Sequence, residues 1–284
     1  MAFEIHYSAA PQNQSEPGSI NNCTIPEAAE FNESSTNNLQ KRVFDGPRDR
    51  IIWLGKFISR NSQWLSQREH SESERRARST QFRFPTEGGT AMGVRAMFDY
   101  TAIIIISRIG VSLSIIPEVP VFKDRQNIER DDRTFYRLGF GALRRQVNRR
   151  YGLGLQDLRE PGHLLAAEHG PQVFIFTPRG PGAVLRWQRK IDQLSRNLHD
   201  LFGQPPEVIG YIVRPRQQSY GVQPTPSTPY AAWGARAIVE VNVNDDIMYV
   251  PPAENDTVDR IWLGRWKLWL EDTVIREEIF CPYT

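Results

Sequence analysis

The feature that most constrains the fold is the run over 100–106, which contains four consecutive isoleucines. β-branched residues favour extended strands, and a strand that is apolar on both sides is typical of a strand covered on both faces. We therefore expect a buried strand here, in the middle of a sheet. Apolar residues alternate with serine over 111–116, which predicts a second strand that ends at Pro117.

A strand–helix–strand unit is expected over about 172–213. The apolar segment 172–176 predicts a strand, and apolar residues at helical spacing over 184–201 predict a helix that ends at Gly203. The segment 208–213 predicts another strand. Such a βαβ crossover normally joins parallel strands.

Amphipathic patterns predict three more helices. The first spans about 48–68, the second follows Asp131 or Asp132 and carries an apolar stripe to Tyr151, and the last follows Asp256 or Thr257 and carries several tryptophans. Glycines at 139 and 141 predict an irregular start to the second helix. The first and last helices share a similar motif, DRIIWLG at 49–55 and DRIWLG at 259–264, which we interpret as two similar helices in one core.

The segment 236–243 alternates apolar and polar residues, as expected of a strand in a sheet with one wet face. Residues 247–250 are expected to pair with it across a turn at 244–246. Together these patterns predict an α+β fold, with α/β as the alternative, built on a mixed sheet with one crossover and several packed helices. We expect a disordered N-terminal arm over 1–45 and a single domain over 46–284.

Composition excludes several classes of protein. The N-terminus lacks the basic start and apolar run of a secretory signal, and no apolar stretch approaches the roughly 20 residues that cross a bilayer. Two cysteines, Cys23 and Cys281, are too few for a disulfide scaffold or a four-cysteine metal site. We expect a soluble intracellular protein, cytoplasmic or nuclear.

The net charge of +2 excludes a global cationic field. The chain is nevertheless rich in arginine, whose planar fork suits phosphate and carboxylate, although the bias of a GC-rich genome explains the same composition. Among the 35 cationic residues only the following are lysines: Lys41, Lys56, Lys123, Lys190 and Lys267.

Two segments are candidate anion sites. In the turn 177–182, Gly180 and Gly182 would bring backbone N–H groups toward an anion and Arg179 would add a guanidinium, but an ordinary βα turn accounts for the same residues. The second segment combines cations with an aromatic ring that could stack on a base, although a solvated helix end is the simpler interpretation. Its residues are Arg144, Arg145, Arg149, Arg150 and Tyr151.

Two acids are candidate catalytic residues. Glu240 lies on a predicted strand and Asp245 in the turn that follows, so both could hold Mg²⁺ as in nucleases with an E-x-K strand. Asn242 occupies the lysine position, which weakens this hypothesis. His163, Glu168 and His169 have the chemistry of zinc ligands, but their spacing differs from that of a helical zinc motif and we expect no metal site. The sequence implies no particular cofactor.

Three functional classes stay open. The first is a non-catalytic binding protein whose arginines engage an anionic partner, with nucleic acid as the first candidate. The second is a nuclease-like or phosphotransfer enzyme that acts on a phosphate-bearing substrate through the 177–182 turn and the acids near 240–246. The third is a subunit of an assembly, including a homo-oligomer formed through the aromatic helices.

Overall fold

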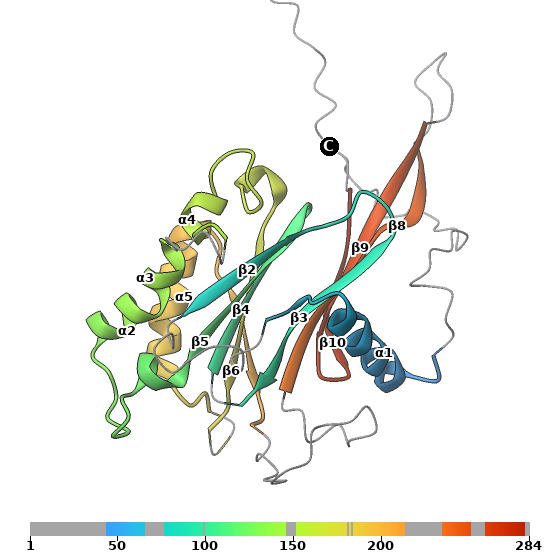
Figure 1. Ribbon diagram of the computed structural model, residues 1–284. Helices are drawn as coiled ribbons and strands as arrows, with labels where there is room; N and C mark the ends of the chain where they lie inside the picture. The colour runs from blue at the N-terminus through green and yellow to red at the C-terminus, as the bar shows by residue number, and fades with distance from the viewer. Residues whose placement is uncertain are drawn as a thin grey trace, which may run out of the picture.

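The computed structural model describes residues 44–65, 77–98, 100–145, 152–180, 182, 184–213, 235–250 and 259–281. The arm expected over 1–45 lies outside the described residues, apart from its last two. Within the described part of the chain, the strands form two five-stranded sheets (Figure 1), and the fold is α+β. No helix in these ranges is long and apolar enough to cross a membrane.

The first sheet, sheet A, contains the N-terminal short strand and the three long strands near the C-terminus. Its order is β1 (Trp64–Leu65), β3 (Gly89–Met97), β8 (Ala235–Val250), β9 (Asp259–Leu270) and β10 (Thr273–Phe280). The strands β1 and β3 are parallel, and the other neighbours are antiparallel. Sheet A is therefore mixed.

The second sheet, sheet B, has the isoleucine strand at its centre. Its order is β2 (Arg78–Arg83), β5 (Gly110–Pro117), β4 (Tyr100–Ser107), β6 (Gln172–Pro178) and β7 (Glu207–Tyr211). Every residue of β4 is buried, as predicted from its sequence. The strands β6 and β7 are parallel and are joined through helix α5 (Gln188–Phe202), which confirms the predicted crossover.

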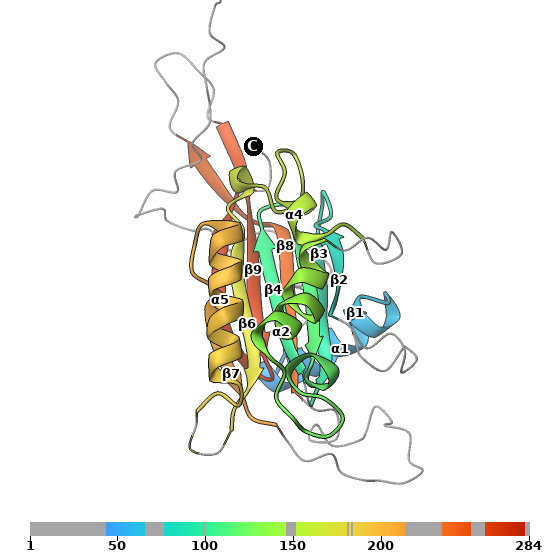
Figure 2. The same ribbon diagram turned by 90° about the vertical axis from the view of Figure 1, so that its left-hand side faces the viewer.

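The two sheets pack face to face and each carries helices on its outer face (Figures 1 and 2). Helix α1 (Pro47–Arg60) covers sheet A, while α2 (Asp132–Leu138), α3 (Phe140–Arg144), α4 (Leu155–Leu158) and α5 cover sheet B. The short turns η3 (Glu118–Phe122) and η5 (Ala167–His169) connect elements on the sheet B side. The fold thus has four layers, in the order helix, sheet, sheet, helices.

Alternating side chains of β4 supply two different cores. Ile104 packs between the sheets with residues of sheet A such as Val239 and Trp266. Ile103 and Ile105 point the other way and pack against the helices over sheet B. Because successive side chains of a strand point to opposite faces, a strand in an inner layer must be apolar at every position.

The predicted helix after Asp131 is two short helices. The side chain of Asp131 accepts a hydrogen bond from the N–H of Thr134 at 2.9 Å, which confirms it as the N-cap. Gly139 separates α2 from α3 with backbone angles of φ −95° and ψ −101°, so the irregularity expected from the glycines is present. The helix predicted over 48–68 ends at Arg60, because Ser62 adopts a left-handed conformation and the chain continues as β1.

The predicted C-terminal helix is wrong, because residues 259–270 form strand β9. Both faces of β9 carry apolar residues: Trp266 and Leu268 face sheet B, whereas Trp269 packs under α1. Because odd and even positions of β9 both carry apolar residues, the alternation that marks a strand is missing. The tryptophans then fit a helical spacing by coincidence. The two similar motifs therefore adopt different structures, a helix at 49–55 and a strand at 259–264.

The expectations for 236–250 are also corrected. The structure has no turn at 244–246, because β8 runs unbroken to Val250, with a register shift against β9 between Asn242 and Asp246. The polar face of this strand is not wet, since Glu240 and Asn242 are 6% and 8% exposed. Helix α1 covers part of that face, and the sequence alternation does not reveal such a cover.

Candidate functional site

The 177–182 turn uses its backbone groups internally. The N–H of Gly180 donates to the carbonyl of Val184 at 2.7 Å, and the N–H of Arg179 donates to the carbonyl of Tyr211 at 2.8 Å. Helix α5 begins only at Gln188, so Gly182 does not lie at its N-terminus. In this loop the N–H groups of Arg179 and Gly180 are therefore taken up by internal hydrogen bonds.

The basic segment is only partly described. Arg144 ends α3, and its Nε donates to the side chain of Gln156 at 2.9 Å, while Arg145 is exposed. Arg149, Arg150 and Tyr151 lie outside the described residues. The structure therefore describes only two of the five residues of this predicted site.

Helix α2 adds two exposed arginines that sequence reasoning missed. Arg133 and Arg137 are four residues apart on α2, so they share one face of the helix. We refer to Arg133, Arg137, Arg144 and Arg145 as the α2–α3 arginine ridge. The spacing of Arg133 and Arg137 in the sequence was the signal that could have found them.

Within the described ranges, no carboxylate forms an ion pair with the ridge arginines. Several other cations of the same layer, in contrast, are ion-paired. Arg186 and Lys123 both pair with the buried Glu118 at 2.8 Å, and Lys190 pairs with Asp132 at 2.6 Å. The ridge is thus a place where positive charge remains available to a partner.

The two candidate catalytic acids are held by different arginines. Glu240 pairs with Arg50 of α1 and accepts a hydrogen bond from Nε1 of Trp269 at 3.1 Å. Asp245 pairs with Arg265 of β9, and its Oδ1 accepts from Asn242 at 3.1 Å. These contacts connect α1 to sheet A and hold the irregular part of β8, so both carboxylates have structural partners.

Lys267 lies directly across from Glu240 in the β8–β9 register, where a cross-strand lysine could replace the missing one of the E-x-K motif. Its Nζ instead lies 3.2 Å from the carboxylate of Glu277 on β10. Lys267 therefore pairs with β10 while Glu240 pairs with Arg50 of α1, which weakens the nuclease hypothesis further.

The histidine-containing segment forms a turn. The carboxylate of Glu168 accepts a hydrogen bond from the N–H of Gly162 at 2.7 Å, and this bond holds the pKa of Glu168 below its usual value. In the described part of the chain, no three metal-ligating side chains come together. Glu168 thus stabilises the loop between α4 and β6.

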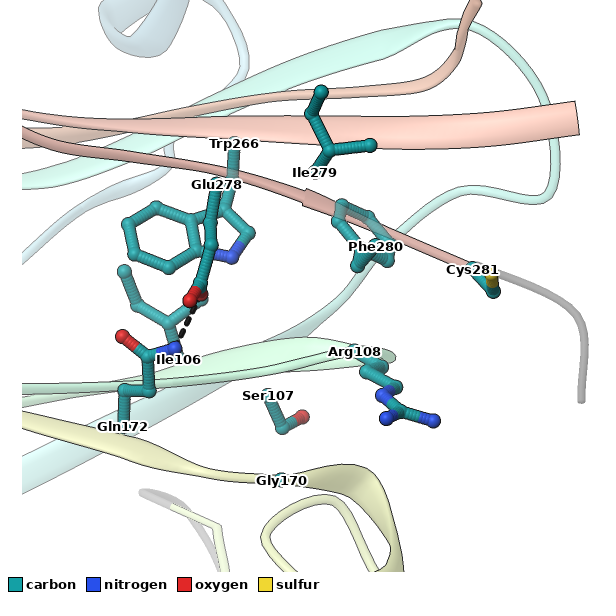
Figure 3. A pocket seen from close by; sticks show the side chains of 10 residues that line it. All are labelled: Ile106, Ser107, Arg108, Gly170, Gln172, Trp266, Glu278, Ile279, Phe280 and Cys281. Carbon is teal, nitrogen blue, oxygen red and sulfur yellow. Dashed lines mark hydrogen bonds between the residues drawn. The ribbon is translucent and has the colours of Figure 1, made fainter. Parts of the chain in front are cut away.

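A cavity of about 280 Å³ lies between the two sheets, at the end where β4 and β10 finish (Figure 3). Sheet B contributes Ile106 and Gln172, and sheet A contributes Trp266, Glu278 and Phe280. A volume of this size is at the lower end of those that hold small molecules. The sequence did not predict this site, because its residues come from four distant segments and one of them was expected to be helical.

Polar groups of the cavity come from both sheets. The side chain of Gln172 donates to the carboxylate of Glu278 and so links β6 to β10 across the gap. The hydroxyl of Ser107 donates to the carbonyl of Leu164 at 2.7 Å, so it is held away from the role of a nucleophile. Cys281, which also lines the cavity, is disulfide-bonded. The cavity therefore has the groups of a binding site, without an activated nucleophile.

Comparisons of the chain with protein families, with curated proteins and with solved structures find no match.

Proposed function

We propose that this protein is a non-catalytic binding protein that engages nucleic acid through the α2–α3 arginine ridge. The observation that carries this proposal is the positive charge of four arginines on α2, on α3 and directly after α3, none of which pairs with a carboxylate among the described residues. Four cations of the same layer, Lys123, Arg186, Arg189 and Lys190, are by contrast ion-paired. Arginine forks bind phosphate oxygens with paired hydrogen bonds, and such contacts supply most of the affinity of non-specific binding.

The structure gives the enzyme alternative less support. Its acids, Glu240 and Asp245, form ion pairs with arginines. The N–H of Gly180 in the 177–182 turn donates to a carbonyl of the same loop. The assembly alternative rested on exposed aromatic helices. Trp266 and Trp269 are instead buried on a strand within the chain. Binding through the ridge therefore needs the fewest rearrangements of the described contacts.

Fluorescence anisotropy with labelled single-stranded and duplex oligonucleotides, over a salt series, tests the proposal on the full chain. We expect affinity to fall steeply with salt, because each phosphate contact contributes a slope of about −0.9 in log K against log salt on duplex DNA. Changing all four ridge arginines to glutamine should remove most of the affinity and reduce the slope by about 3 to 4.

A matched control changes four other exposed arginines to glutamine, namely Arg48, Arg60, Arg83 and Arg196. This variant loses the same formal charge, so it separates a local site from the effect of net charge. The proposal requires the control to keep the slope of the parent protein. Equal losses in the two variants, or no binding at low salt, would contradict it.

A further inference from the structure

The cavity between the sheets carries opposite charges at different places. Figure 3 shows the carboxylate of Glu278 beside the indole of Trp266, whereas the guanidinium of Arg108 lies away from them, below Cys281. Apolar walls formed by Ile106 and Phe280 complete the lining. An occupant that matches this lining has a positive end, a negative end and an apolar part between or beside them.

Trp266 offers a hydrogen-bond donor to the cavity. The residue is only 3% exposed, its ring packs edge-on against Phe174 at a centroid distance of 6.1 Å, and its indole N–H is on the cavity side (Figure 3). The structure shows no hydrogen bond from this N–H to another described residue, and the N–H faces the cavity. An oxygen of a molecule bound in the cavity would therefore find a donor here.

The charged groups of Arg108 and Glu278 differ in the partners that they already have. Among the described residues, the guanidinium of Arg108 has no ion-pair partner, although its backbone N–H donates to the carbonyl of His169 at 3.0 Å. Glu278 accepts from the neutral amide of Gln172, and its nearest cation, Arg276, lies 3.8 Å away. Both charges can therefore gain a closer counter-charge from a ligand.

We propose that this cavity binds a dipeptide-sized zwitterion. Its ammonium group pairs with Glu278, its peptide carbonyl accepts from the indole N–H of Trp266, and its carboxylate pairs with Arg108. An apolar side chain packs on Phe280. A free dipeptide carries these three polar groups in this order, and its size suits a cavity of about 280 Å³.

Isothermal titration calorimetry on the full chain tests the proposal with three matched probes. Glycyl-leucine carries both charges, N-acetyl-glycyl-leucine lacks the ammonium, and glycyl-leucinamide lacks the carboxylate. We expect glycyl-leucine to bind at least about tenfold more tightly than either capped probe, since each capped probe loses one charged contact. Failure of glycyl-leucine to bind at millimolar concentration, or equal binding of the three probes, would overturn the proposal.

Variants assign each end of the ligand. Glu278→Gln should abolish the preference for glycyl-leucine over its acetylated form, and Arg108→Gln should abolish the preference over the amide. Trp266→Phe keeps the ring but removes the donor, so it should weaken all three probes. The exposed residues Glu207 and Arg159 lie outside the cavity lining, and Glu207→Gln with Arg159→Gln should change nothing.

The variants at Glu278 and Arg108 change partly exposed side chains, so they test the proposal even if Trp266→Phe disturbs folding. If both charge variants keep the parent protein's preference for glycyl-leucine over the capped probes, the ligand binds elsewhere. That result would contradict the assigned ends.

Discussion

Arg50 of α1 and Glu240 of β8 form an ion pair although they are 190 residues apart in the chain. The Nε of Arg50 lies 3.2 Å from the same carboxylate oxygen that accepts the indole N–H of Trp269. One buried carboxylate therefore joins a helix to two neighbouring strands of sheet A. This contact gives Glu240 a structural role in sheet A.

We expect Glu240→Gln to lower the free energy of unfolding by about 2 to 3 kcal/mol, because it leaves Arg50 partly buried without its counter-charge. Urea denaturation measures this change. Glu87 is exposed and forms no ion pair within the described residues, so Glu87→Gln should change stability by less than about 0.5 kcal/mol. An unchanged stability of Glu240→Gln would show that the ion pair does not hold α1.

Local patterns were enough to predict the centre of sheet B and its crossover. The isoleucines of β4 and the apolar stripe of α5 each produce a signal that depends on one element alone. The same reasoning failed for β9, because Trp266 and Trp269 pack in different cores on its two faces. A sequence pattern cannot show which layer will cover which face.

The candidate sites were predicted less well than the fold. Arg144 and Arg145 follow each other in the sequence and were recognised as a charge cluster, whereas Arg133 and Arg137 join them only once α2 and α3 pack side by side over sheet B. The cavity was not predictable, since Gln172 and Glu278 are 106 residues apart and meet across two sheets. Sites formed by distant segments require the tertiary contacts first.

Asp132 of α2 should make stability depend on pH. Hydrogen bonds from Lys190 and Arg189 lower the pKa of Asp132 from 3.8 to about 2. Because the pKa is lower in the folded state, Asp132 stabilises the protein above about pH 4, and this contribution is lost as the pH falls toward about 2. Melting temperatures of the parent and of Asp132→Asn should therefore differ near neutral pH and converge in acid.

Asp200 provides the control for this experiment, because it is exposed on α5 and forms no ion pair within the described residues. Asp200→Asn should follow the parent protein across the pH range. Lys190→Met should lose a large part of the acid-dependent stability that Asp132→Asn loses, since it removes one of the two hydrogen-bond donors to Asp132 and leaves Arg189. A constant difference between the parent and Asp132→Asn down to about pH 2 would contradict the pKa assignment.

Adjacent isoleucines of β4 should be equally important for stability although they face different layers. Ile104 is buried between the sheets and Ile105 under the helices of sheet B, each with no exposed surface. Either residue changed to alanine should lower the free energy of unfolding by about 2 to 5 kcal/mol in urea denaturation. Ile128 is 60% exposed, so Ile128→Ala should have little effect. A small cost at Ile104 would mean that the sheets pack loosely.

Gly264 of β9 lies opposite Phe280 of β10 and leaves room for its ring. A Cβ at position 264 would lie 2.5 Å from Cζ of Phe280, so Gly264→Ala should displace the ring and lower the free energy of unfolding by about 1 to 3 kcal/mol. Gly46→Ala, which introduces a Cβ with no atom within 4 Å, is the control for urea denaturation. If the clash is the cause, Phe280→Leu should make Gly264→Ala less costly, so that the double variant is more stable than the sum of the two changes predicts. Additive effects would show that the ring is not what excludes a side chain at 264.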